Sequence, residues 1–143
     1  MPSLAREPTF LPLTVSAAAT AASDPSPASA PPNGRVLAHR AAQANAAAAE
    51  CWVALLAGCD SPGRQLLPIR LRELSEATAM YAGTRWWYGA GSHHRRRVSE
   101  SQARIELAVA ERDGAEYAEA FVGYDQAVAT IVVHVRSRGS HTP

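Results

Sequence analysis

Hydrophobic and small residues recur every three or four positions between residues 35 and 57, which is the spacing of an α-helix with one buried face. Six of them form a single seam: Leu37, Ala41, Ala44, Ala48, Cys51 and Leu55. Gly58 follows at the position where a helix commonly ends in a left-handed residue. Because alanines spaced by four let another helix come close, this helix is also a candidate surface for a homo-oligomer.

A second helix is predicted from Pro68 to Tyr81. The turn-forming residues 60–63 separate it from the first helix, and proline suits a first helical turn because its missing N–H would have no partner there. The hydrophobic positions again repeat by three and four: Leu67, Leu71, Leu74, Thr78 and Tyr81. Gly83 is expected to end this helix.

The third helical region is predicted to start at Ser99, because Ser99 and Gln102 have the spacing of a capping box. Asp113 and Gly114 then interrupt the helical pattern. Asp113 with Glu116 repeats the capping-box spacing, which predicts a kink or a new helix start at this point.

The most regular hydrophobic repeat of the chain follows and predicts a core helix that continues to about Arg136. Its members are Tyr117, Phe121, Tyr124, Val128, Ile131 and Val135. The β-branched residues within 130–135 leave a short strand as the alternative, since periodicity does not decide so brief a stretch. Together the elements predict an all-α fold, a small antiparallel bundle of three or four helices over residues 34–138, with 139–143 as a disordered tail.

Composition indicates that the core is small. The 143 residues fit one domain, and 47% of them are hydrophobic, but 30 are alanine, whereas Leu, Ile, Val and Phe together number only 26. The net charge is +1, which lacks the strong charge imbalance of most disordered chains. No run approaches the roughly 18 consecutive apolar residues of a membrane-spanning helix, so we predict no transmembrane segment.

Residues 1–33 differ in composition from the rest of the chain. They contain seven of the ten prolines, and Ala, Ser and Thr fill most of the remainder, which predicts a disordered tail. The alternative is a secretory signal over residues 10–22, preceded by Arg6. Glu7 and Pro12 argue against a signal, so we expect a cytoplasmic protein, with a secreted helical protein as the alternative.

Residues 84–97, with the sequence TRWWYGAGSHHRRR, contain the candidate chemistry. The candidate binding residues combine planar rings with arginines: Arg85, Trp86, Trp87, Tyr88, His93, His94, Arg95, Arg96 and Arg97. Guanidinium groups suit phosphate and flat rings stack on bases, so a loop that binds nucleic acid or another anionic surface is one interpretation. In the favoured interpretation the segment serves internal packing or contacts with a protein partner. Trp86 or Trp87 would then fill the core, and the arginines would pair with residues 100–125, which carry seven acids against two arginines.

Neither a metal site nor an enzyme is predicted. Cys51 and Cys59 are eight residues apart and do not form a CxxC pair, and a zinc site that joined them to His93 and His94 would lack paired ligand spacing. We expect Cys51 to be buried on its helix seam. The chain contains no GxSxG, phosphate loop, GxGxxG or HExxH motif, so we predict no cofactor and no catalytic residue.

The stretch ERDGAEYAEAFVGYDQAVATIVV, residues 111–133, resembles small helical proteins carried by conjugative plasmids and integrated elements of Streptomyces and related actinobacteria. With the preceding RVSESQARIELAVA, the resemblance covers about a quarter of the chain. It implies an accessory role in plasmid transfer, of the kind attributed to plasmid spread proteins, and it brings no catalytic residues.

The sequence thus predicts a non-enzymatic helical accessory protein that supports plasmid transfer or spread through protein–protein contacts. The contacts are expected at residues 84–97 and on the exposed face of the last helix. The main alternative is a small nucleic-acid-binding protein or transcriptional regulator that uses the same arginine- and tryptophan-rich segment.

Overall fold

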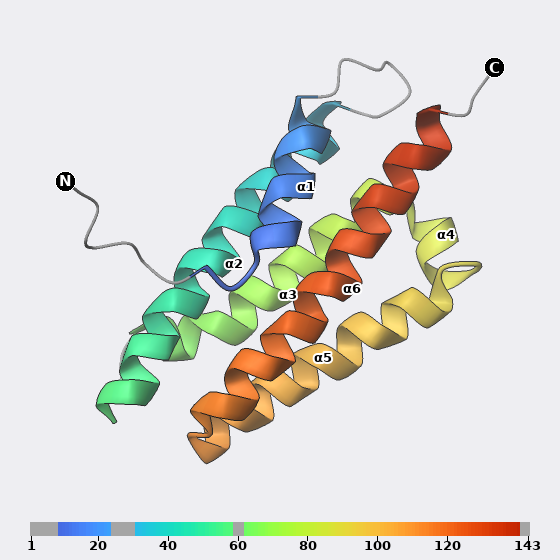
Figure 1. Cartoon of the computed structure of the whole chain (residues 1–143). Coiled ribbons are helices and arrows are strands. Elements are labelled where there is room, and N and C mark those ends of the chain that lie inside the picture. Colours follow the sequence, from blue (N-terminus) through green and yellow to red (C-terminus); the bar gives the residue numbers. More distant parts are fainter. Residues whose placement is uncertain (1–8, 24–30, 59–61, 141–143) are drawn as a thin grey trace.

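The computed structural model describes residues 9–23, 31–58 and 62–140, and within them it contains six helices and no strand (Figure 1). The helices are α1 (Pro12–Ala22), α2 (Pro31–Ala57), α3 (Pro62–Ala82), α4 (Thr84–Tyr88), α5 (Ser92–Glu111) and α6 (Gly114–Ser140). The all-α prediction is confirmed, but three or four helices is too few, because α1 and α4 are additional. The strand considered for 130–135 is wrong, since this stretch lies inside α6.

The four long helices α2, α3, α5 and α6 alternate in direction, and α1 lies between α2 and α6 (Figure 1). α6 packs against α5, α1 and α3, so its hydrophobic stripe faces the core. The predicted stripe is buried as expected, except that its last member, Val135, is only partly buried: Tyr117, Phe121, Tyr124, Val128 and Ile131 have no exposed surface. The helix continues to Ser140, a turn beyond the predicted end.

The alanine seam of α2 packs inside the bundle of its own chain. Leu37, Ala41, Ala44, Ala48 and Cys51 are at most 1% exposed, and α2 packs against α1 and α3. Neighbouring helices of the same chain already cover this seam, so a homo-oligomer through α2 would have to use another face of the helix and stays a prediction. The predicted burial of Cys51 is confirmed.

α3 begins at Pro62, and Pro68 lies inside the helix. The predicted start at Pro68 is therefore wrong. Proline suits a first helical turn, which is the position that Pro62 occupies. Pro68 lies further inside, where it lacks one backbone N–H donor but does not end the helix. The predicted end is confirmed, because the helix stops at Ala82 and Gly83 follows with a positive φ of 96°.

α5 begins at Ser92, so the predicted start at Ser99 is wrong. The helix is entered from a glycine turn, and the backbone N–H of Arg95 donates to the carbonyl of Gly91 at 3.0 Å. The capping-box spacing at Ser99 therefore falls within an established helix, where the backbone N–H groups already have partners.

The break between α5 and α6 confirms the predicted new start. Arg112 has a left-handed φ of 57°, and α6 begins at Gly114. The carboxylate of Asp113 accepts a hydrogen bond from the backbone N–H of Glu116 at 3.0 Å, which is one half of the predicted capping box.

The prediction of disorder for residues 1–33 is wrong for residues 12–22, which form α1, and for residues 31–33, which begin α2. The ring of Phe10, just before α1, contacts Trp52, Tyr117 and Phe121 with centroid distances of 5.6, 5.4 and 5.3 Å. Residues 139–140, predicted as tail, also belong to a helix, whereas 1–8, 24–30 and 141–143 lie outside the described residues.

Polar groups from distant helices hold the start of α1. The carboxylate of Asp125 accepts hydrogen bonds from the backbone N–H groups of Leu13 and Thr14, at 3.1 and 2.8 Å. The side-chain oxygen of Asn45 accepts those of Phe10 and Leu11, at 2.9 and 3.0 Å. These bonds satisfy N–H groups that have no partner within the helix. The acceptors are far away in the sequence, so local composition does not predict these bonds.

Of the helices described, none is both long enough and apolar enough to cross a membrane.

Candidate functional site

The predicted basic-aromatic loop is helical for most of its length. Residues 84–88 form α4 and residues 92–97 form the first turns of α5, so only 89–91 make a turn. The carbonyl of Trp86 accepts backbone hydrogen bonds from Gly89 and Gly91, at 3.1 and 2.7 Å. A loop was expected because two glycines lie close together, but these glycines instead allow a tight turn between two helices.

Trp86 is held in a group of rings that also contains His93, His94 and His134. The indole lies nearly parallel to His94 and to His134, with centroid distances of 5.7 and 5.4 Å. The rings of His93 and His94 are 3.9 Å apart. The guanidinium carbon of Arg138 lies 5.7 Å from the centre of the Trp86 ring. Trp86 is therefore partly buried and already engaged in stacking within its own chain.

The other two aromatic residues of the segment have opposite environments. Trp87 is 6% exposed and belongs to the hydrophobic core, which confirms the interpretation that one of the two tryptophans fills the core. Tyr88 is 67% exposed, and the guanidinium carbon of Arg95 lies 5.1 Å from the centre of its ring. Tyr88 is thus the most accessible of the three rings.

The arginines of the segment do not pair with the acidic part of the chain. Arg85, Arg96 and Arg97 are exposed, and within the described residues none of them makes an ion pair. The half-buried Arg95 donates to the carbonyl of Trp87 at 3.3 Å. The predicted pairing of these arginines with residues 100–125 is therefore wrong.

Two acids of that range show why the pairing fails. Glu116 binds Arg104 at 2.7 Å, and Asp125 is buried at the start of α1. Glu116 is in the first turn of α6, which begins at the end of the bundle opposite α4, and Asp125 is nine residues further along the same helix (Figure 1).

We call the set Arg85, Trp86, Tyr88, His93, His94, Arg95, Arg96, Arg97, His134 and Arg138 the basic corner. The last two members come from α6 and were not predicted as site residues. Their spacing of four places them on one face of a helix, but only the fold brings that face beside α4.

The electrostatics of the basic corner are dominated by positive charge. The pKa of His94 lies below its ordinary value of 6.5, first because burial penalises the charged ring. Neighbouring His93, His134 and Arg97 lower it further, since a second positive charge close by is unfavourable. The exposed guanidinium groups of Arg85, Arg96 and Arg97 carry the positive charge that suits this corner to anionic groups of a partner.

The described residues contain no group of three or more potential metal-ligating side chains, and Cys59 lies outside them. The thiol of Cys51 is buried, and burial raises its pKa, whereas a hydrogen bond with Tyr117 acts in the opposite direction. A thiol of this kind remains protonated and is a poor nucleophile.

Comparison with known proteins finds no family model, no curated protein and no solved structure that matches this chain. Inferences about its role therefore depend on the geometry of its own residues.

Proposed function

We propose that the protein is a non-enzymatic helical accessory protein that binds an acidic surface of a protein partner through the basic corner. A role in plasmid transfer or spread, which the sequence resemblance implies, belongs to the same proposal. In this role the helical bundle is a rigid support, and the arginines of α4 and α5 supply the recognition.

The observation that carries the proposal is the exposure of Arg85, Arg96 and Arg97 without an ion pair among the described residues. Arginine makes planar, bidentate contacts with carboxylates, which gives such a surface specificity as well as charge attraction. Because the three arginines lie at one end of the bundle, a partner could approach them without displacing a helix (Figure 1).

Nucleic-acid binding is the second candidate, favoured by the same exposed guanidinium groups. Proteins that bind single strands combine such charges with aromatic rings on which bases stack. Here Trp87 is buried and Trp86 is stacked on two histidines, which leaves Tyr88 as the main accessible ring. The arrangement therefore supports carboxylate recognition better than base stacking.

The decisive experiment compares two variants with the same loss of charge. Arg96→Ala with Arg97→Ala removes two arginines of the basic corner, and Arg35→Ala with Arg72→Ala removes two exposed arginines from α2 and α3. Capture from the native host after nuclease treatment should yield a partner that the wild type and the α2/α3 control retain. The basic-corner variant should lose most of it.

Fluorescence anisotropy with labelled single-stranded and duplex DNA tests the nucleic-acid alternative. Tight DNA binding that weakens steeply with salt, and that is lost in the Arg96/Arg97 variant alone, would replace the proposal with the nucleic-acid alternative. If both variants capture the partner equally and bind DNA equally, the basic corner binds neither a protein partner nor nucleic acid.

A further inference from the structure

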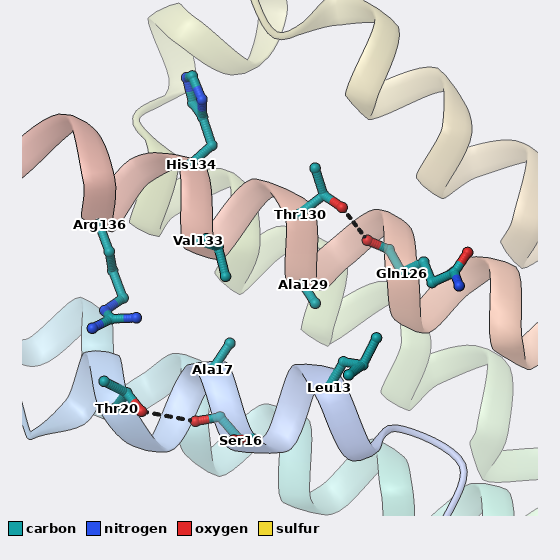
Figure 2. Close-up of a pocket in the computed structure, with 10 residues that line it drawn as sticks. All are labelled: Leu13, Ser16, Ala17, Thr20, Gln126, Ala129, Thr130, Val133, His134 and Arg136. Carbon is teal, nitrogen blue, oxygen red and sulfur yellow. Dashed lines mark hydrogen bonds between the residues drawn. The ribbon is translucent and has the colours of Figure 1, made fainter.

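A groove of about 640 Å³ lies between α1 and α6 (Figure 2). Of the basic corner, His134 alone is among the residues that line it. The two helices run in the same direction (Figure 1), and the backbone N–H of Thr14 in α1 donates to the carboxylate of Asp125 in α6. The size of the groove lies within the range of small-molecule sites. We infer that this groove binds a single-chain anionic amphiphile, of which a medium-chain fatty acid is the simplest example.

Four aliphatic side chains, those of Leu13, Ala17, Ala129 and Val133, form the apolar part of the groove wall. Leu13 and Val133 are 50% and 48% exposed, although both side chains face the groove. Ala17 of α1 and Ala129 of α6 also face the groove, and their short side chains leave space between the two helices (Figure 2). Removing half-exposed aliphatic side chains from water is favourable, so an alkyl chain that covers them would be bound by the hydrophobic effect.

Polar side chains occur along the whole groove, and Arg136 is the one with a permanent charge among the described residues that line it; the others are Ser16, Thr20, Gln126, Thr130 and His134. Arg136 extends from α6 toward Thr20 of α1 at one end (Figure 2). The hydroxyl groups of Ser16 and Thr20 lie on the rim, and Thr20 donates its proton to the carbonyl of Ser16 at 3.2 Å. No carboxylate lines the groove among the residues described. A guanidinium group has five N–H donors, so Arg136 can bind a ligand carboxylate in addition to its contacts within the chain.

Length and charge together define the ligand. From Gln126 to Arg136 the groove follows ten residues of α6, which is about 15 Å at the rise of an α-helix. The carboxylate would lie at Arg136, and the alkyl chain would pass Ala17 and Ala129 and end near Leu13. Arg136 keeps its contacts within the chain, and an anionic head group would add a charged hydrogen bond that a neutral lipid does not make.

The test uses the full-length protein and isothermal calorimetry with octanoate and decanoate below their critical micelle concentrations and with decanol below its solubility limit. The affinity should rise about two- to fourfold per added methylene, which is the effect of partial burial of each group. Decanoate should bind about tenfold more tightly than decanol, because only decanoate makes a charged hydrogen bond with Arg136. In Arg136→Gln the two ligands should bind equally.

Substitution of the aliphatic side chains that line the groove tests whether the ligand binds there. Leu13→Ser with Val133→Ser should weaken both decanoate and decanol about tenfold, since half-exposed side chains contribute little to folding but line the groove. Val36→Ser with Leu66→Ser is the matched control, because these residues are 46% and 39% exposed on α2 and α3. The control should bind as the wild type does, and decanoate should shift the amide resonances of Ala17 and Ala129.

Any one of the following results would overturn the inference: no saturable binding of decanoate below its micelle concentration, equal affinity for decanoate and decanol in the wild type, a preference for decanoate that persists in Arg136→Gln, or unchanged binding in the Leu13/Val133 variant. A loss of binding in the Val36/Leu66 control would also contradict it, because binding would then not be confined to the groove. These results do not depend on the outcome of the partner experiment at the basic corner.

Discussion

The pKa of His94 depends on both burial and the positive charges of the basic corner. It lies beside Trp86 and is surrounded by His93, His134 and Arg97, all of which carry or can acquire a positive charge. Burial and these neighbours lower its pKa, so the neutral ring is the form that suits the folded protein.

The stability of the protein should therefore decrease as the pH falls. A histidine whose pKa is lower in the folded state than in the unfolded state binds its proton less readily when folded. As the pH falls below 6.5, the unfolded chain gains a proton that the folded chain does not, and the free energy of unfolding decreases until the folded pKa is passed. In His94→Gln this part of the pH dependence should be absent.

Urea unfolding of the wild type and of His94→Gln at about pH 8 and about pH 5 measures the effect. The wild type should lose more stability between these values than the variant does. An NMR titration of His94 gives an independent check, and a midpoint at or above 6.5 would contradict the expectation.

Gly91 and Gly123 provide a second comparison at the scale of single residues. A β-carbon at Gly91 would lie 2.6 Å from the ring of Trp86, whereas one at Gly123, inside α6, would lie 3.4 Å from the hydroxyl oxygen of Ser101. Gly91→Ala should therefore destabilise the protein by about 1–2 kcal/mol through overpacking. Gly123→Ala should stabilise it by about 0.5–1 kcal/mol, because alanine loses less backbone entropy in a helix.

Chemical denaturation followed by tryptophan fluorescence distinguishes the two changes. Gly91→Ala should also alter the native emission, because Trp86 must move away from its histidine partners. If both substitutions stabilise the protein to the same extent, the turn between α4 and α5 does not constrain Trp86.

Among the helices, α1 depends most clearly on other parts of the chain. It has 11 residues, and no side chain of its own accepts a hydrogen bond from the amides of its first turn. Asp125 of α6 and Asn45 of α2 supply the acceptors for this end of the helix. A helix this short is only marginally stable in water, so these contacts and the burial of Leu11 and Ala18 determine its position.

Replacement of Asp125 should consequently release the start of α1. Asp125→Ala removes both acceptors from the amides of Leu13 and Thr14 and should lower the free energy of unfolding by about 2 kcal/mol. Hydrogen exchange should become faster in α1 than in α3. Glu119→Ala, on an exposed position of the same helix, is the control and should change stability by less than about 0.5 kcal/mol.

Asp125→Asn separates the contribution of charge from that of the hydrogen bond. Its side-chain oxygen can still accept one amide proton, so we expect a smaller loss than in Asp125→Ala. Equal protection of α1 from exchange in the wild type and in Asp125→Ala would show that burial alone positions the helix.

For the whole molecule, α6 organises both candidate sites. One side of the helix meets α1 and forms the groove, and its carboxyl-terminal part carries His134 and Arg138 to the basic corner (Figures 1 and 2). The buried phenol of Tyr117 donates to the carbonyl of Ala48 at 2.7 Å, and that of Tyr124 donates to the carbonyl of Leu71 at 3.2 Å. These bonds connect α6 to α2 and α3 and fix the position of both surfaces.

The sequence by itself determined the helical class, the buried stripe of α6, the seam of α2 and the break at Asp113. These features depend on local periodicity and on side chains that cap their own backbone, so neighbouring residues are sufficient to predict them. The sequence also identified residues 84–97 as a basic and aromatic segment, because that property is one of composition.

Only the tertiary structure decided which of these side chains are accessible and what they meet. Trp87 is buried whereas its neighbour Trp86 stacks on histidines from two helices, and α1 forms because Asp125, more than a hundred residues away, accepts its first amides. The groove between α1 and α6 is likewise not predicted by any local sequence pattern, because its two sides are far apart in the sequence. Contacts of this kind depend on how helices pack across the whole chain, and no window of neighbouring residues contains that information.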